Sequence, residues 1–424
     1  MKIVVFEDDK FDLLYPLSML RAVYDVKPGA SSILEKISAA SGKTAGSISL
    51  HCRKSLAPLM KSQTDLPVNE FGKDDYLLLN GRFVFDKKFI NKLLKSKPDD
   101  NYFISGSSVA YATVSKAKSV FLNGNSINDE GTFSREFFEY SGLGVQNIEA
   151  KNFKELIYPW DVVAHLLSGG LTEDLDSIGI KGKTSSGKNF VKARNIQASA
   201  KSKISRNAVL DATDGKIIIE QGCEIEPFVF IKGPAYIGKN SLIKSGAKIY
   251  GPCVIGEGSK VAGEMAESVF HSHVNKQHDG FVGHSYICPF VNLGADTVTS
   301  DLKNNYSNIR QNFKGGNIDT GMRFLGSILG DHTKTSINTM LNTGTVAGIF
   351  SNIFGGGFPA KSVNSFSWNE AGKTSEKYNF DKAIETAKIV MSRRGIKTSD
   401  EYIELTRKYI ENDSESSMYG NDIR

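Results

Sequence analysis

The chain has 424 residues, of which 40% are hydrophobic and 23% are charged. This composition is typical of a soluble globular protein, and the length is too great for one ordinary core, so we expect two or three domains. The net charge of +5 is spread along the chain without an aromatic-basic module, which argues against a nucleic-acid partner.

The N-terminal residues form no cleavable apolar segment, and no apolar run in the sequence reaches 18 residues. We therefore expect a cytoplasmic protein that has no membrane partner. The four cysteines are too few and too scattered for a disulfide framework or a paired-cysteine metal site, so buried, reduced thiols are expected.

Short apolar runs alternate with helical patterns in the first part of the chain. We expect strands at residues 3–6, 76–79, 102–104 and 120–122, and helices at residues 13–20, 31–37 and 159–167. This alternation predicts an α/β domain with a doubly wound sheet. Such sheets bind ligands at the carboxyl ends of their strands, which places residues 7–21 and 80–82 beside any site.

The composition then changes, which suggests the domain boundaries. A first domain at residues 1–170 is followed by a stretch at 171–203 that is rich in glycine, serine, lysine and aspartate, as linkers are. A second domain follows at residues 204–365. Residues 366–424 form a C-terminal segment with an amphipathic helix at 380–391, a second helix from about residue 399, and a polar tail.

A six-residue repeat is the strongest pattern in the second domain. Aliphatic β-branched residues recur without a slip at Ile219, Ile225, Ile231, Ile237, Ile243, Ile249, Ile255 and Val261. Neither a helix nor an ordinary strand alternation requires this period, so each hexad is predicted to form one short strand of a repeat array. Three hexads make one triangular coil, and stacked coils bury the aliphatic side chains in a continuous column.

The hexad register resumes in two later runs. These are Phe281, Ile287, Leu293 and Thr299, and then Leu329, Thr335, Leu341, Ala347 and Ile353. The stretches between the runs are expected to be loops that project from the column, and loops on a rigid scaffold often carry function.

Four of the seven histidines, His271, His273, His278 and His284, lie within fourteen residues where the register first breaks. Polar residues there do not help to fill an aliphatic column, so their concentration indicates a functional site. The alternative is a solvated loop whose histidines bind backbone carbonyls.

One motif in this region resembles a known family. The segment from Lys276 to Gly283, followed by Val291 to Thr297, is similar to the acetyltransferase half of the bifunctional glucosamine-1-phosphate acetyltransferase and N-acetylglucosamine-1-phosphate uridyltransferase. The resemblance implies a left-handed parallel β-helix that acts as a homotrimer, with sites shared between subunits and acetyl-CoA as the co-substrate.

The resemblance also implies roles for particular residues. His278 would be the general base, because a neutral imidazole can take the proton of an attacking amine. Asn292 would position the acyl acceptor. The substrate-binding residues would be Lys276, Phe281, Asn305 and Tyr306, and the coenzyme A-binding residues would be Ala295 and Gly355. Phe281 replaces a tyrosine of the family, so the sequence leaves open whether the acceptor is glucosamine-1-phosphate or another amino sugar.

The N-terminal part looks like a divergent group of GlmU-like sugar nucleotidyltransferases with hexapeptide tails. The similar residues run from Pro16 through Arg21 to Gly29, and continue at Leu34-Glu35-Lys36. This resemblance implies a nucleotide-binding site at Arg21, Lys36, Asn80 and Gly81, with Mg²⁺ as a cofactor. Asn80-Gly81 stands where classical enzymes place a magnesium-binding Gly-Asp.

These patterns lead to one main expectation and two alternatives. The main expectation is a sugar-phosphate nucleotidyltransferase-like protein whose β-helix moves an acetyl group from coenzyme A to an amino-sugar phosphate or a nucleotide amino sugar, without a metal site in the β-helix. One alternative is a zinc lyase of the β-helical carbonic anhydrase type, in which His273 and His278 would be ligands. The other is a non-catalytic trimer that binds a nucleotide sugar.

Overall fold

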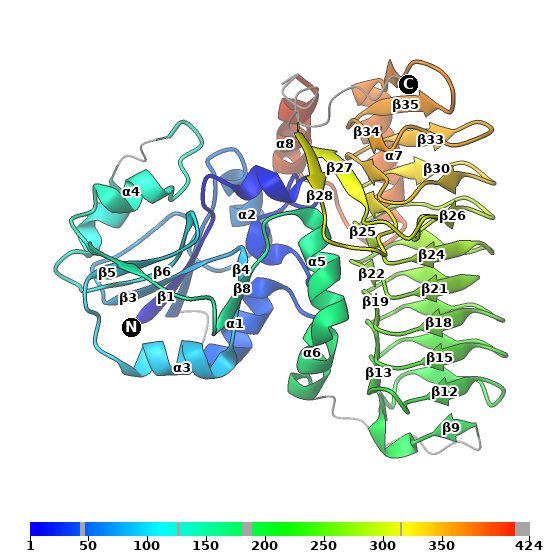
Figure 1. Cartoon of the computed structure of the whole chain (residues 1–424), viewed down its shortest axis with the longest axis horizontal. Helices are drawn as coiled ribbons and strands as arrows, with labels where there is room; N and C mark the ends of the chain where they lie inside the picture. The colour runs from blue at the N-terminus through cyan, green and yellow to red at the C-terminus, as the bar shows by residue number, and fades with distance from the viewer. Residues whose placement is uncertain (43–46, 125–127, 180–188, 314–315, 412–424) are drawn as a thin grey trace. The chain divides into compact units, whose positions relative to one another are not determined.

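The computed structural model describes residues 1–42, 47–124, 128–179, 189–313 and 316–411 (Figure 1). The contacts divide the chain into two compact units. The first unit contains Met1–Val26, Ser31–Pro159 and Asp400–Leu405, and the second contains Lys27–Ala30, Trp160–Ser399 and the residues from Thr406 onward. Among the described residues, no helix combines the length and the apolar character needed to cross a membrane.

The first unit is built on a mixed six-stranded sheet. Its strands, in spatial order, are β2 (Ile48–His51), β1 (Lys2–Phe6), β3 (Tyr76–Asn80), β6 (Ser108–Val114), β5 (Asn101–Ser105) and β7 (Gly144–Asn147). Strand β1 runs parallel to both of its neighbours, whereas β6 is antiparallel to β3 and β5. A separate antiparallel pair is formed by β4 (Phe83–Phe85) and β8 (Phe153–Glu155).

Helices cover this sheet. They are α1 (Ile33–Ser41), α2 (Ala57–Gln63), α3 (Lys87–Lys95), α4 (Arg135–Glu139) and the 3-10 helices η1 (Phe11–Leu14), η2 (Val23–Asp25) and η4 (Ser119–Asn123). Ser32 and Glu35 form a capping box that starts α1. Phe137 and Phe138 of α4 pack against Val4 and other alternate residues of the strands, which makes one core of the unit.

Two of the predicted elements in this unit are wrong. Residues 13–20 form only the short η1 and turns, because Pro16 has no N–H to donate and its ring would clash with the preceding helical turn. Residues 120–122 belong to η4 rather than to a strand. A strand would turn Val120 and Leu122 to the same face, but Val120 is 55% exposed whereas Leu122 is buried.

The second unit contains a parallel β-helix, as the hexads predict. Its first face is a nine-stranded sheet with the order β10 (Ile196–Ala198), β13 (Ile217–Ile219), β16 (Ala235–Ile237), β19 (Cys253–Ile255), β22 (Val269–Phe270), β25 (Tyr286–Ile287), β29 (Ile328–Leu329), β32 (Val346–Ala347) and β34 (Ser362–Val363). All of these strands pair in parallel, each with the strand of the next coil.

Two further faces complete each coil. The second face contains β11 (Lys203–Ile204), β14 (Glu224–Ile225), β17 (Leu242–Ile243), β20 (Lys260–Val261), β23 (Asn275–Lys276), β30 (Lys334–Thr335), β33 (Asn352–Phe354), β35 (Ser367–Glu370) and β36 (Glu376–Lys377). The third face contains β9 (Phe190–Val191), β12 (Val209–Asp211), β15 (Phe230–Lys232), β18 (Lys248–Tyr250), β21 (Glu264–Ala266), β24 (Phe281–Gly283), β26 (Val298–Thr299) and β31 (Met340–Leu341).

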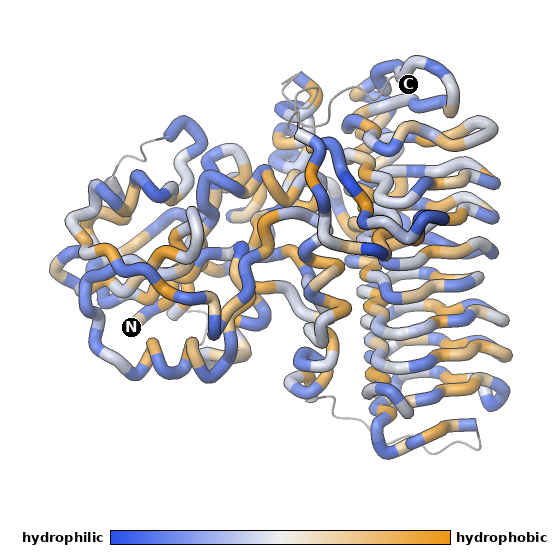
Figure 2. The backbone as a smooth tube through the Cα atoms, viewed as in Figure 1, coloured by the Kyte–Doolittle hydropathy of each residue, from blue (hydrophilic) through white to orange (hydrophobic). Residues whose placement is uncertain are grey.

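The aliphatic column is confirmed. All eight hexad residues from Ile219 to Val261 are at most 1% exposed and belong to one core cluster. Ile219, Ile237 and Ile255 pair with one another in register along the first face, which shows that three hexads make one coil. Figure 2 shows hydrophobic segments recurring in successive coils.

The first expected break in the column is wrong. Residues 262–280 do not project as a loop, because β21, β22 and β23 continue the three faces. The side chains that point inward there are Met265, Phe270 and Lys276. The steps from Val261 to Met265 and from Met265 to Phe270 are shorter than six residues because the corners are shorter, and the step to Lys276 is again six. Val282, not Phe281, is the next inward residue, since it pairs with Met265 and joins the core.

The loop expected between the second and third hexad runs is present, and we call it the excursion. Between β26 and β29 the chain leaves the column and forms the antiparallel hairpin β27 (Arg310–Phe313) and β28 (Gly316–Asp319). The column then resumes through Leu329, Leu341 and Ile353, as the third hexad run predicts.

The ends of the β-helix differ from the expected boundaries. The stretch 171–203 begins with helix α6 (Leu171–Ser177), which follows α5 (Pro159–His165) and η5 (Leu166–Gly170). It ends with β9, the short η6 (Ala193–Asn195), β10 and the start of β11, so the first coil begins before residue 204. Glycine, serine and lysine suit the corners and outer faces of a coil as well as a linker. Residues 180–188 of this stretch and the tail from residue 412 lie outside the described residues.

Two helices follow the last coil, as expected. They are α7 (Phe380–Ser392) and α8 (Asp400–Glu411). The buried stripe of α7 contains Ala383, Ile384, Ala387 and Met391, which matches the predicted amphipathic pattern.

Stacked aromatic rings line the corner between the first and second faces. We call this set the aromatic ladder, and its members are His273, Phe290, His332, Phe350 and Phe366. Successive ring centroids are 4.6 to 5.2 Å apart, and every member has a positive φ of 52 to 62°. Side chains of this size rarely adopt that conformation, so the stacking must offset its cost.

Candidate functional site

His278 lies at a corner of the β-helix where the chain passes from the second face to the third. We call residues 277–280 the His278 corner. The imidazole is exposed. Gly280 has a φ of 115°, and a Cβ there would lie 2.2 Å from the carbonyl oxygen of Thr297, so the corner requires glycine. The exposed imidazole can therefore reach a bound ligand.

Backbone hydrogen bonds stack the His278 corner on the corner of the next coil. The N–H of Asp296 donates to the carbonyl oxygen of Asp279 at 3.0 Å. Ala295, which precedes Asp296, in turn accepts from the N–H of Asn338 at 2.8 Å. The structure thus brings the predicted base and the predicted coenzyme A-binding alanine to adjacent corners.

Asn292 lies on the outer side of the second face, beside the same corners. Its Oδ1 accepts a hydrogen bond from Nδ2 of Asn275 at 2.5 Å, and Oδ1 of Asn275 accepts from Nε2 of Gln277 at 2.8 Å. Isolated bridges align Asn275 with Asn292 and Asn292 with Lys334. This chain of amides fixes the half-buried Asn292 side chain between two coils.

Lys276 does not fit its predicted role as a substrate-binding residue. It is fully buried, because its side chain points into the aliphatic column at the position that Val261 occupies one coil earlier. Its Nζ donates to the carbonyl oxygens of His278 at 2.8 Å and Asp279 at 2.9 Å. Burial lowers the pKa of the Lys276 ammonium group to about 8.

The other predicted residues of the β-helix are more accessible. Phe281 is half-buried on the outer side of the third face, opposite Glu264. Asn305 and Tyr306 are exposed on the excursion that carries the β27–β28 hairpin, and Tyr306 is 63% exposed. Gly355 is exposed with a φ of 96°. Their roles in binding stay predictions.

The clustered histidines do not converge. His273 stacks in the aromatic ladder at one end of β23, whereas His278 follows the other end. In the part of the chain that the structure describes, no group of three His, Cys, Asp or Glu side chains could hold a metal ion. The zinc-lyase alternative therefore lacks a ligand set in these residues.

His284 forms an arrangement that the sequence did not reveal. Its Nε2 contacts Oε2 of Glu267 at 2.6 Å, and its Nδ1 contacts Oδ2 of Asp301 at 2.8 Å. Burial alone would lower the pKa of His284, but the hydrogen bonds and charges of the two carboxylates raise it to about 9. The residues come from three coils, so their spacing of 17 gives no local motif.

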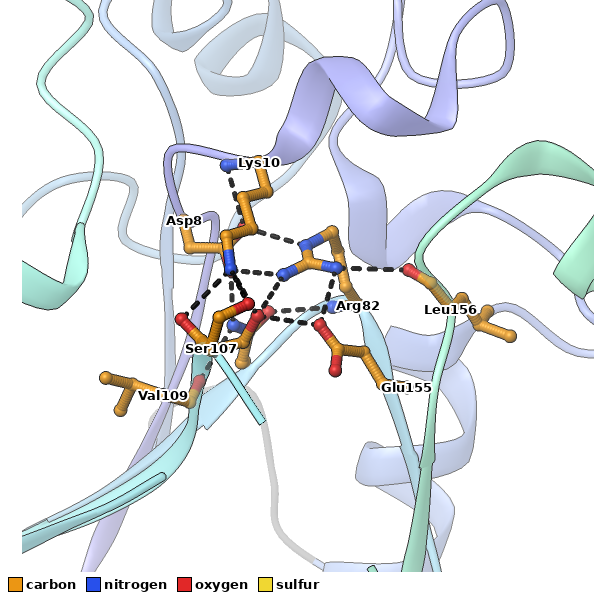
Figure 3. Close-up of polar contacts among 9 residues, drawn as sticks. Asp8, Lys10, Arg82, Ser107, Val109, Glu155 and Leu156 are labelled. Carbon is orange, nitrogen blue, oxygen red and sulfur yellow. Dashed lines mark hydrogen bonds and ion pairs between the residues drawn. The ribbon is translucent and has the colours of Figure 1, made fainter. Parts of the chain in front are cut away.

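In the first unit, the predicted ligand-binding edge of the sheet is filled by ion pairs (Figure 3). Asp8 follows β1, and its two carboxylate oxygens accept from Nε of Arg82 at 2.8 Å and from Nη2 at 2.6 Å. Nη1 of Arg82 donates to Glu155 at 3.0 Å. Although burial alone would raise the pKa of Asp8, the charge and hydrogen bonds of Arg82 lower it.

A second buried pair lies beside the first. Nη1 and the backbone N–H of Arg53 donate to the Glu7 carboxylate at 2.7 and 2.9 Å. Both side chains are at most 1% exposed. The two arginines are thus neutralised within the chain and do not present free charge to a phosphate.

Asn80 and Gly81 do not fit their predicted role in nucleotide binding, because both are buried. Nδ2 of Asn80 donates to Asp8 and to the carbonyl oxygen of Val109, each at 2.9 Å. A Cβ on Gly81 would lie 2.9 Å from Tyr24, so this glycine serves close packing. Arg21 and Lys36 are half-buried and stay candidates for binding.

The predicted Mg²⁺ site can be tested against these contacts. Mg²⁺ prefers carboxylate and water oxygens in an open octahedral arrangement. The carboxylates at this edge, Glu7 and Asp8, are occupied by Arg53 and Arg82. In this arrangement the residues do not fit a magnesium site.

The fold and the site define a class of protein, namely a two-unit protein with an α/β sheet and a parallel β-helix of hexapeptide repeats. A family model matches the α/β part of this arrangement. Residues 3–179 match the family model described as sugar nucleotidyl transferase. The resemblance to GlmU-like sugar nucleotidyltransferases is confirmed.

Two curated relatives illustrate this similarity. A bifunctional sugar-1-phosphate nucleotidylyltransferase/acetyltransferase of Sulfurisphaera tokodaii is 34% identical over 144 residues, which are 34% of this chain and 36% of the relative. The bifunctional protein GlmU of Methanococcus aeolicus is 30% identical over 157 residues, which are 37% of each chain. The matched region thus spans little more than a third of either relative.

Solved structures are also similar. The UDP-N-acetylglucosamine acyltransferase of Francisella novicida matches with 16% identity and a TM-score of 0.24, over 53% of this chain and 76% of that one. A hexapeptide transferase family protein of Anaplasma phagocytophilum matches with 15% identity and a TM-score of 0.18, over 50% and 92%.

Proposed function

We propose that the β-helix transfers an acetyl group from coenzyme A to the amine of an amino-sugar phosphate or a nucleotide amino sugar. The observation that carries this proposal is the placement of His278 at an exposed corner, stacked on Ala295 and beside Asn292. The names of the relatives, which include acetyltransferase, support it.

The proposed step needs only one proton acceptor from the protein. The amine nitrogen attacks the thioester carbonyl carbon, a C–N bond forms, and the C–S bond breaks. His278 takes the proton of the attacking amine and can return it to the coenzyme A thiolate. Asn292 would hold the acceptor so that its amine faces the thioester.

We also propose that the active form is a homotrimer. Exposed apolar side chains near the His278 corner support this: Ile337 is 68% exposed, and Val298 and Met340 are each 36% exposed. Ile337 precedes Asn338, whose N–H bonds to Ala295 in the candidate site. A neighbouring subunit that covers these residues would also close a cleft around His278.

The experiment is an assay of thiol release from acetyl-CoA with a panel of amino-sugar phosphates and nucleotide amino sugars. We expect His278→Ala to lower kcat by about 10²- to 10⁴-fold, the range typical of a lost general base. Asn292→Ala should lower activity with the acceptor at limiting concentration. His271→Ala, a histidine on another corner, is the control and should retain activity. Equal turnover by the His278 and His271 variants would rule out the proposed base.

For the first unit we propose binding of a sugar phosphate or nucleotide sugar that involves Arg21 and Lys36, the two predicted binding residues that are half-buried and not fully buried. Calorimetric titration of the full chain should show saturable binding. Pyrophosphate release should stay at background with Mg²⁺, because Glu7 and Asp8 are engaged. Mg²⁺-dependent release would show that these ion pairs open in turnover.

A further inference from the structure

Lys276 is a charged residue at an inward position of the column, where an aliphatic side chain is expected. Its neighbours in register on the second face, Ile243 and Val261, are aliphatic and fully buried. An ammonium group buried among such residues is costly unless hydrogen bonds compensate for its lost hydration. A hydrophobic residue of similar length would fill the same space without that cost.

The ammonium group is directed at a single feature, the His278 corner. Its two hydrogen bonds, of 2.8 and 2.9 Å, both go to carbonyl oxygens of that corner, those of His278 and Asp279. Hydrogen bonds from a charged donor are roughly twice as strong as neutral ones. The corner is thereby tied from inside the column, while the imidazole on the same backbone faces outward.

The remaining backbone contacts of the corner are ordinary neutral hydrogen bonds. Asp279 also accepts from the N–H of Asp296 at 3.0 Å, and Gly280 accepts from the N–H of Glu264 at 3.0 Å. These bonds set the height of the corner between the coils. The hydrogen bonds from Lys276 hold the corner toward the interior of the column and so fix the distance of His278 from that column.

We propose that Lys276 is a positioning residue for His278, which fixes the backbone of the His278 corner from the interior of the β-helix so that the imidazole meets the substrate amine at one distance. This inference rests on the proposed acetyl transfer, because only that function gives His278 a reacting partner. Lys276 itself touches neither substrate nor coenzyme A.

The test replaces the lysine with an apolar residue of nearly the same shape, Lys276→Met. Ile243→Met, at an inward position of the same row, is the matched control. Both variants should fold. Because removing a buried charge is often neutral for stability, the free energy of unfolding of Lys276→Met should be no lower than that of the control.

Hydrogen exchange gives a readout that does not depend on activity. We expect the amides of Asp296 and Glu264, which donate to the carbonyl oxygens of Asp279 and Gly280, to exchange roughly 10- to 100-fold faster in Lys276→Met, because Lys276 no longer holds the corner that accepts their hydrogen bonds. Exchange in Ile243→Met should match the wild type there. Unchanged exchange in Lys276→Met would overturn the inference, whatever the activity.

Kinetics give the second readout. In an active protein, Lys276→Met should lower kcat by about 10- to 100-fold, the effect of a displaced catalytic group, with the KM for acetyl-CoA unchanged. If His278→Ala is inactive but Lys276→Met turns over like the wild type, the positioning role is refuted and the proposed function stands. If the wild type releases no thiol, the proposed function fails, and the exchange data alone then decide whether Lys276 orders the corner.

Discussion

At the scale of single residues, His284 shows how a charged side chain can join separate coils. Glu267 and Asp301 bind its two ring nitrogens from the coils on either side, and Phe324 stacks on the ring with centroids 5.0 Å apart. Leu302 and Phe324 form the bridge at the base of the β27–β28 excursion. His284 therefore holds the base of the segment that carries Asn305 and Tyr306.

This arrangement predicts a pH dependence of stability. The pKa of His284 is raised to about 9 in the folded chain, above the ordinary value of about 6.5, so its contribution is complete below pH 6.5 and is lost as the pH rises through 9. A shift of this size corresponds to about 3 kcal/mol. Urea unfolding of the wild type and His284→Gln should therefore differ most at pH 6 and converge near pH 10.

The comparison with a variant is needed because two lysines of the β-helix titrate in the opposite sense. Burial lowers the pKa of Lys276 and Lys334 to about 8, so their destabilising effect diminishes as the pH rises. Both lysines are present in the wild type and in His284→Gln, and their effect cancels in the difference. A difference that does not vary with pH would show that His284 is not charged in the folded chain.

The residue scale also shows what the sequence could not supply. Asn80 ends strand β3 and Gly81 follows it, so the sequence correctly placed both at the carboxyl edge of the sheet. The burial of Asn80 depends on its hydrogen bond to Asp8, which pairs with Arg82, 74 residues away in the chain. No local pattern reveals that a carboxylate and a guanidinium so distant in the chain pair with each other instead of binding a ligand.

At the scale of elements, the hexads determined most of the second unit. The strict repeat from Ile219 to Val261 predicted strands, faces and buried positions because in these coils successive inward residues are always six positions apart. The prediction became wrong where the steps shortened, at Met265 and Phe270, because a register defined by sixes no longer identifies the inward residue. Handedness stays an implication of the family resemblance.

The contribution of the aromatic ladder to the free energy of unfolding can be measured. Phe350 is 1% exposed and stacks between His332 and Phe366 with centroid distances of 4.6 and 5.1 Å. Phe350→Ala should cost about 3–5 kcal/mol of unfolding free energy, because it removes a large buried ring. Chemical denaturation would measure this loss.

Two further variants separate packing from backbone conformation. Phe350 has a φ of 56°, which glycine adopts without strain, so Phe350→Gly should be about 1–2 kcal/mol less destabilised than Phe350→Ala. Phe358, which is 57% exposed, serves as the control, and Phe358→Ala should have little effect. A glycine variant less stable than the alanine variant would contradict the strained corner.

At the scale of the whole molecule, the proposed trimer has a direct test. Light scattering after gel filtration should give three times the mass of one chain. Ile337→Lys places a charge on an exposed apolar side chain next to the candidate site and should shift the mass toward that of a monomer. Acetyl transfer should fall in parallel if the site is shared between subunits.

A control distinguishes this effect from general damage. Ile389 of α7 is 57% exposed, and Ile389→Lys should leave the mass and the activity unchanged. A monomeric wild type would refute the trimer. An Ile337→Lys variant that stays trimeric would place the interface elsewhere on the β-helix.

The pairing of Ile219 with Ile237 and of Ile237 with Ile255 has a consequence for how such a protein can change in length. Removing or adding one whole coil of 18 residues in this region keeps every remaining side chain on its former face. Each such change would alter the length of the β-helix on the N-terminal side of His278 by one strand spacing, about 4.8 Å. The number of coils on the N-terminal side of the His278 corner can therefore change in whole 18-residue steps without a change in the residues of that corner.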